Sequence, residues 1–151
     1  YTTERPLHLG AVMGGAQADQ VAALHTYGLS LGRAFQLRDD LLGVYGDPAQ
    51  TGKPAGDDLR EGKRTVLVAL ALAELDESDR AEFTAGLDAG DPDAVPDLRR
   101  LLDRTSARTG VEMLIDQEAR AARQALTAVA LPSEAADVLA ELVDVAIRRG
   151  S

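Results

Sequence analysis

The sequence predicts an all-α protein, and three observations support that prediction. Ala (26) and Leu (22), which lose little side-chain freedom in a helix, fill 48 of the 151 positions, whereas aromatic residues make up 3%. Apolar residues recur at spacings of three, four and seven positions, the periodicity of a helix with one buried face. The two-residue alternation of a half-buried strand is not sustained anywhere. From its length we expect one all-helical domain over residues 1–151.

The first half of the chain predicts a short helix, a long helix and a long loop. The short helix falls within residues 2–17, and the long one runs over 19–45 with Asp19 as a good N-terminal cap. Residues 46–63 hold four Gly and two Pro with little apolar content, which predicts a loop. A loop of this length inside a compact domain is commonly functional.

The second half predicts further helices only. They are expected over residues 64–75, 78–88, 97–109, 111–129 and 133 to about 149. Gly110 is expected to end the third of these, and Ser133 is the expected N-terminal cap of the last.

Composition excludes several classes of protein. The net charge of −9 and the pI of about 4.6 argue against binding to nucleic acid or to an anionic membrane. The sequence contains no Cys, so disulfides, thiolate zinc sites and Cys nucleophiles are excluded. No apolar run approaches a membrane span, and no secretory signal opens the chain. With Tyr1 in place of an initiator Met, these observations suggest a piece of a longer cytoplasmic protein.

Charged residues with complementary chemistry lie between residues 35 and 65. The pair Asp39–Asp40 falls within the long, mostly apolar helix, where carboxylates cost desolvation energy unless a cation compensates. Mg²⁺, which prefers oxygen ligands and commonly joins carboxylates to phosphates, is a natural partner. Lys53 and Lys63 supply positive charge for a diphosphate. The spacing therefore predicts a metal–diphosphate site.

These residues also admit other interpretations, and two known motifs do not fit them. The spacing of Gly46, Gly52 and Lys53 does not match a P-loop, and residues 47–61 do not match an EF-hand. The acid pair is alternatively a solvated patch, or is neutralised by Arg33 and Arg38. Asp57 and Asp58 suit a helix cap or the bracing of a loop as well as they suit metal binding. His8 and His25 are interpreted as isolated core or surface histidines.

The order of these motifs resembles a known family. The run GLSLGRAFQLRDDLLGVYGDPAQTGKPAGDDLREGKRT resembles the second aspartate-rich region of the isoprenyl diphosphate synthases, the polyprenyl synthetase family. The opening YTTERPLHLGA resembles the segment that follows the family's Lys-Thr/Ser motif. The resemblance is strong up to about residue 70 and weaker beyond it. It implies that the chain is the C-terminal half of an isoprenoid-synthase helical bundle.

The resemblance also implies an activity and roles for particular residues. The activity is the head-to-tail condensation of isopentenyl diphosphate with an allylic diphosphate through Mg²⁺-assisted ionisation. Asp39 would bind Mg²⁺ directly, and Asp40 would act on the same ions partly through water. Lys53 and Lys63 would hold the allylic diphosphate. Phe35 and Gln36 would line the site, and Asp39, Lys53 and Lys63 are the expected catalytic residues. A cytoplasmic homodimer is implied for the intact protein.

The sequence departs from the family pattern in two ways. Gly43 occupies the third acidic position of the motif Asp-Asp-x-x-Asp, and Asp47 lies too far along the helix to replace it. We therefore expect the third acid to be dispensable here. The family's first aspartate-rich motif and its arginines for isopentenyl diphosphate would precede Tyr1. Half an active site is thus expected, without condensation activity by this chain alone.

Two other functions compete with a prenyltransferase. A non-catalytic prenyl-synthase-like subunit, or a helical interaction module, would explain Gly43 and the absent first motif. The presence of Asp39, Lys53 and Lys63 argues against it, because a non-catalytic protein would be free to lose these residues. A terpene cyclase of similar architecture is disfavoured because cyclases line their cavities with aromatic residues, and this chain has few.

Overall fold

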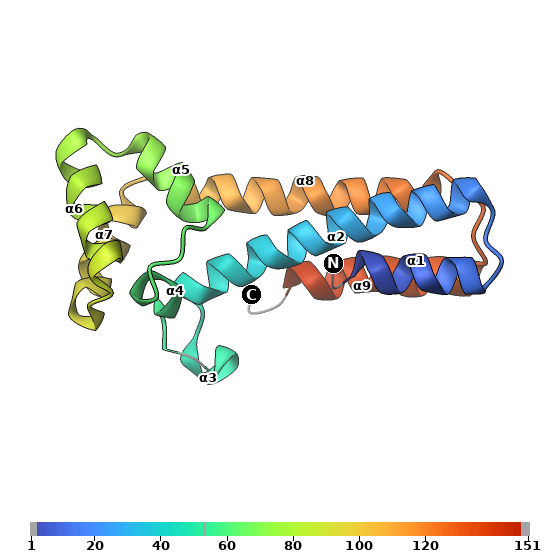
Figure 1. Ribbon diagram of the computed structural model, residues 1–151, viewed down its shortest axis with the longest axis horizontal. Helices are drawn as coiled ribbons and strands as arrows, with labels where there is room; N and C mark the ends of the chain where they lie inside the picture. The colour runs from blue at the N-terminus through green and yellow to red at the C-terminus, as the bar shows by residue number, and fades with distance from the viewer. Residues whose placement is uncertain (1–2, 53, 149–151) are drawn as a thin grey trace. The chain divides into compact units, whose positions relative to one another are not determined.

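The computed structural model describes residues 3–52 and 54–148, and this part of the chain contains helices and no strand (Figure 1). The all-α prediction is confirmed. The elements are α1 (Glu4–Met13), α2 (Ala18–Tyr45), α3 (Pro48–Thr51), α4 (Asp57–Arg60), α5 (Val66–Glu74), α6 (Glu77–Ala89), the 3₁₀ helix η1 (Pro92–Ala94), α7 (Val95–Asp103), α8 (Ala107–Thr127) and α9 (Ser133–Arg148).

The predicted boundaries of the long helix are confirmed, whereas the helix end predicted at Gly110 is wrong. The helix predicted over 19–45 is α2, and the segment predicted as a loop holds the short helices α3 and α4. Gly110 does not end a helix but lies inside α8, whereas the break between α7 and α8 comes at residues 104–106. A Cβ on Gly110 would lie 3.1 Å from Leu70 Cδ1, so the glycine serves close packing instead of termination.

The chain divides into two compact units. The first comprises the residues up to Arg38 and those from Leu114 to the end of α9, and the second comprises Asp39–Met113. The expectation of a single domain stays a prediction.

The first unit is built from α1, α9 and the parts of α2 and α8 that belong to it. Small and branched side chains of all four helices form its core, which lets the helices approach closely. The buried core residues are Ala11, Leu24, Tyr27, Leu31, Ala119, Ala122, Ala125, Leu126, Val143 and Ala146. Two hydrogen bonds fix α2 in this unit: Gln20 Nε2 donates to Ala130 O at 2.6 Å, and Tyr27 Oη donates to Leu139 O at 2.7 Å.

The second unit gathers the shorter helices around the end of α2 and the beginning of α8. Helix α7 packs against α4 and α6, and its buried residues are Leu98, Leu101 and Leu102. Tyr45, at the end of α2, donates a hydrogen bond to Asp103 Oδ1 at 3.0 Å, and the guanidinium of Arg108 lies 4.7 Å from its ring centre. These contacts anchor the last turn of α2, and the acidic residues Asp39 and Asp40 lie one to two turns before it.

Among the described helices, none combines the length and apolar character that a membrane span requires.

Burial of the Tyr27 hydroxyl predicts a pH dependence of stability. Desolvation raises the Tyr27 pKa from 10.0 to about 12, so the folded state holds the phenolic proton more tightly than the unfolded state does. The stabilisation is complete below pH 10.0 and is lost as the pH rises towards about 12. Tyr27→Phe should lower the free energy of unfolding by about 1 kcal/mol at neutral pH, because the bond to Leu139 O is lost.

Urea unfolding at about pH 8 and at about pH 11 measures this effect. The Tyr27→Phe variant should lose less stability between the two pH values than the wild type does. Some loss should remain, because burial and the hydrogen bond to Asp103 also raise the Tyr45 pKa to about 12. Equal losses in the variant and the wild type would contradict the assignment to Tyr27.

Candidate functional site

Helix α2 carries four of the residues predicted for the site. Phe35 and Gln36 lie in the part of α2 that belongs to the first unit, and both are exposed. Asp39 and Asp40 follow one helical turn later, in the second unit. Asp40 is buried and Asp39 is half-buried, so neither carboxylate belongs to a fully solvated patch. Arg33, which the alternative interpretation paired with the two aspartates, contacts Glu118 at 3.4 Å.

Helix α4 adds two further buried carboxylates, and each pairs with a base that follows it. Arg60 pairs with Asp57 in the same short helix. Lys63 Nζ lies 2.5 Å from Asp58 Oδ1 and 3.0 Å from Glu61 Oε2. The hydrogen bonds to Asp58 and Glu61 raise the Lys63 pKa above its usual range, so the ammonium stays charged at neutral pH. The loop-bracing interpretation of Asp57 and Asp58 therefore has direct support.

The conformation of residues 56–63 is fixed by backbone contacts as well. Gly56 precedes α4 with φ at 83°, a left-handed conformation that glycine tolerates, and a Cβ there would collide with Val95. The amide of Lys63 donates to Asp58 O at 3.0 Å. This turn places the Lys63 side chain beside the Asp58 carboxylate.

The Asp58 carboxylate packs directly against the backbone of Gly43. A Cβ built on Gly43 would overlap the Asp58 carboxylate, with the Cγ and Oδ2 atoms closer than any van der Waals contact and Oδ1 at 3.0 Å. The carboxylate of Asp58 thus fills the place where a side chain at position 43 would begin. The side chain that fills this space therefore comes from α4.

The position of Gly43 relates Asp58 to the predicted metal ligand. Asp39 and Gly43 are four residues apart in α2, so they share a helix face, and side chains at this spacing have their Cβ atoms about 5–6 Å apart. The Asp58 carboxylate consequently lies over the same face of α2 as Asp39, and the Lys63 ammonium accompanies it. Asp39, Asp58 and Lys63 form the centre of the candidate site.

The acidic residues suit Mg²⁺ without forming a closed cage. Within the described part of the chain, Asp39, Asp40 and Asp58 do not bring three oxygen atoms within 4.8 Å of one another. Mg²⁺ keeps several waters and is commonly bound through one or two carboxylates together with phosphate oxygens. The donor set, all oxygen and partly buried, fits that mode. Lys53 lies outside the described residues.

A pocket of about 730 Å³ in the second unit is not the site that the sequence predicts. Residues 54–60 and 92–104 contribute its lining, including four guanidinium groups. Arg60 pairs with Asp57, Arg100 with Asp97 at 3.0 Å and Arg104 with Asp79 at 2.8 Å. The fourth guanidinium, that of Arg99, lies 5.6 Å from the ring centre of Tyr45. Because three of the four charges are already paired within the protein, the pocket offers an anion no strong attraction.

The comparisons with known proteins decide the family. The sequence model of the family described as polyprenyl synthetase matches residues 1–104. The chain belongs to the polyprenyl synthetase family. A short chain isoprenyl diphosphate synthase of Methanothermobacter thermautotrophicus is 36% identical over 140 residues, which cover 93% of this chain and 43% of that protein. A geranylgeranyl diphosphate synthase of Mycobacterium tuberculosis is 50% identical over 64 residues, 42% of this chain and 18% of that protein.

A solved polyprenyl synthetase relative has the same fold. The crystal structure of a geranylgeranyl pyrophosphate synthase from Corynebacterium glutamicum, complexed with isoprenyl diphosphate and magnesium, matches with a TM-score of 0.91 at 43% identity. The match covers 99% of this chain and 43% of that one. The chain therefore spans less than half the length of these relatives.

Sequence reasoning missed the position of Asp58. The expectation that a third acid is dispensable stays a prediction, but it did not foresee that a carboxylate from another helix packs against Gly43. A signal was present: a glycine in an otherwise side-chain-rich helix face indicates close approach of another group. The sequence does not say which of the acids in 57–61 approaches.

The shared space predicts that position 43 tolerates no side chain. Gly43→Ala should lower the free energy of unfolding by about 1–3 kcal/mol, because the methyl group must displace the Asp58 carboxylate and its ion pair with Lys63. Gly10→Ala is the matched control, since a Cβ in that α1 position meets nothing within 4 Å. It should be neutral or gain up to about 1 kcal/mol from helix propensity. Urea unfolding measures both.

A double-variant cycle separates the overlap from a general effect on α2. In the Asp58→Ala background the Gly43→Ala substitution should cost less than in the wild type, with a coupling of about 0.5–3 kcal/mol. Strictly additive losses would show that the two residues do not compete for one space.

Proposed function

We propose that this chain supplies the diphosphate-binding side of a prenyltransferase active site. The reaction is the condensation of isopentenyl diphosphate with an allylic diphosphate. The observation that carries the proposal is the arrangement of Asp39, Asp58 and Lys63, in which carboxylates for a metal and an ammonium for a phosphate meet at the end of α2. The activities named for the relatives support it, including one solved with isoprenyl diphosphate and magnesium.

Each residue of the candidate site is assigned a role in the proposed reaction. Asp39 would hold Mg²⁺ directly and Asp40 partly through water, with the Asp58 carboxylate beside Gly43 on the same face of α2. Lys53 and Lys63 would hold the allylic diphosphate. Phe35 and Gln36 would line the site next to the reacting carbons. Mg²⁺, when bound, neutralises charge on the diphosphate and so assists its departure. Lys63 adds a fixed positive charge that needs no reorientation during the reaction.

The bond changes balance without any further reactant. The C–O bond of the allylic diphosphate breaks, and its electron pair leaves with the diphosphate. The double bond of isopentenyl diphosphate attacks the allylic carbon to form the new C–C bond. A proton is then lost, which restores a double bond, so the products are the longer prenyl diphosphate, inorganic diphosphate and one proton. A cytoplasmic location and a homodimeric intact protein belong to the same proposal.

Removing the Asp39 charge tests the proposed metal contact in the intact protein. Asp39→Asn should lower turnover by about 10²–10³-fold, because the metal loses a direct ligand where leaving-group charge develops. Asp47→Asn is the matched control: Asp47 is exposed and its carboxylate accepts from Ala49 N at the start of α3, a bond the amide oxygen of Asn retains. Turnover is measured from labelled isopentenyl diphosphate with Mg²⁺ and an allylic diphosphate.

One outcome would contradict the metal contact, and another would favour the competing function. Equal losses in Asp39→Asn and Asp47→Asn would contradict the assignment of the metal contact. No condensation by the intact wild-type protein would favour a non-catalytic subunit instead.

The chain of 151 residues by itself should bind an allylic diphosphate weakly and only with Mg²⁺, and should give no condensation product. The reason is that the charge of the diphosphate is only partly neutralised by the residues present here. Incubation with Mg²⁺, farnesyl diphosphate and labelled isopentenyl diphosphate, followed by extraction of prenyl products, is the measurement. Steady formation of longer prenyl diphosphates would show that this side of the site suffices.

A further inference from the structure

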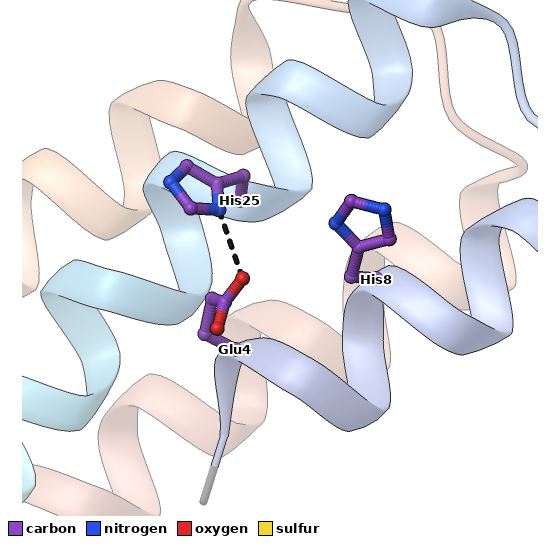
Figure 2. Close-up of side chains that lie close together, drawn as sticks. All are labelled: Glu4, His8 and His25. Atoms are coloured by element: carbon purple, nitrogen blue, oxygen red, sulfur yellow. Dashed lines mark hydrogen bonds and ion pairs between the residues drawn. The ribbon is translucent and has the colours of Figure 1, made fainter. Parts of the chain in front are cut away.

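The two histidines of the sequence lie together with a glutamate in the first unit. Glu4 and His8 are one turn apart in α1, and His25 comes from α2, so the three side chains point into one place between two helices (Figure 2). One ligand atom from each residue lies within 4.8 Å of the other two. His25 Nδ1 already contacts Glu4 Oε1 at 3.0 Å. Both histidines are exposed, as the surface interpretation has them, but they do not stand alone.

A glycine holds the two helices close enough for this meeting. A Cβ on Gly28 of α2 would lie 2.8 Å from Glu4 Cα and 3.2 Å from Leu7 Cδ1, so only glycine lets the backbone of α1 approach here. Gly28 follows His25 by one turn, which puts the point of closest approach beside the cluster. The position of Glu4 relative to His25 is thus fixed by backbone packing as well as by their own contact.

The donor set is that of a borderline divalent cation. Two imidazoles and one carboxylate bind Zn²⁺ in three-ligand sites, with water in the fourth position. Imidazole also suits Co²⁺ and Ni²⁺, whereas Mg²⁺ prefers oxygen ligands. Tetrahedral bonds of about 2.0–2.1 Å place ligand atoms about 3.3 Å apart. Since the present separations are within 4.8 Å, they need to close by about 1.5 Å at most. Both histidines are exposed.

We propose that Glu4, His8 and His25 form a site for one zinc-class divalent cation that joins α1 to α2. The cation takes the place of the proton in the contact between His25 Nδ1 and Glu4 Oε1, and His8 completes the protein ligands from the next turn of α1. All three ligands belong to the first unit. The proposal does not depend on the prenyltransferase function, because the acids assigned to Mg²⁺ belong to the second unit.

Titration of the intact protein with Co²⁺ in a large excess of Mg²⁺ tests the site. Mg²⁺ occupies oxygen-rich sites and leaves an imidazole site to Co²⁺, whose visible absorption reports tetrahedral coordination. The wild type should bind one equivalent with that absorption, and Zn²⁺ should displace it. His8→Gln and His25→Gln should each weaken Co²⁺ binding by at least about tenfold and abolish the tetrahedral absorption.

Two controls keep the result specific. Glu4→Gln should weaken binding, whereas Glu141→Gln, which removes an exposed carboxylate of α9 in the same unit, should not. Far-ultraviolet circular dichroism checks that each variant retains its helices. Absence of saturable Co²⁺ binding by the wild type would overturn the proposal, and so would unchanged binding in both histidine variants.

Discussion

The Asp58 carboxylate lies where a side chain at position 43 would begin, and this constraint organises the second unit's polar residues. It requires glycine at position 43 of α2, because any Cβ would overlap the carboxylate. It also requires the turn that follows α4, because that turn brings Lys63 to within 2.5 Å of Asp58. A buried carboxylate without a partner would be costly, so the lysine is part of the arrangement and not an addition to it.

This constraint makes the candidate site depend on two helices. Helix α2 supplies Asp39 and Asp40, and α4 supplies the Asp58 carboxylate. A site assembled from two helices depends on the fold between them. The contacts of Tyr45 with Asp103 and Arg108 anchor the end of α2, and the packing of α4 on α7 holds the other side within the same unit.

Sequence patterns predicted the helices well because their signal is local. The Ala- and Leu-rich periodicity predicted the all-α class and α2 to within a residue. Gly110 was misjudged because a glycine that ends a helix and a glycine that admits Leu70 look alike in one sequence. The long-range pairings were inaccessible for a related reason: which acid meets Gly43, and that His8 meets His25, depends on how elements distant in sequence pack. The sequence shows which residues could bind a metal or a phosphate, but not which of them lie close together in the fold.

A crystal structure of the intact protein with Mn²⁺ and inorganic diphosphate tests the central claim most directly, since the anomalous signal of Mn²⁺ locates the metal without ambiguity. The account predicts Mn²⁺ bound to an Asp39 oxygen, diphosphate in contact with Lys63, and the Asp58 carboxylate still seated over Gly43. Mn²⁺ and diphosphate bound away from the end of α2, with the pair of Asp58 and Lys63 unchanged, would reduce that pair to a loop brace and would contradict the account.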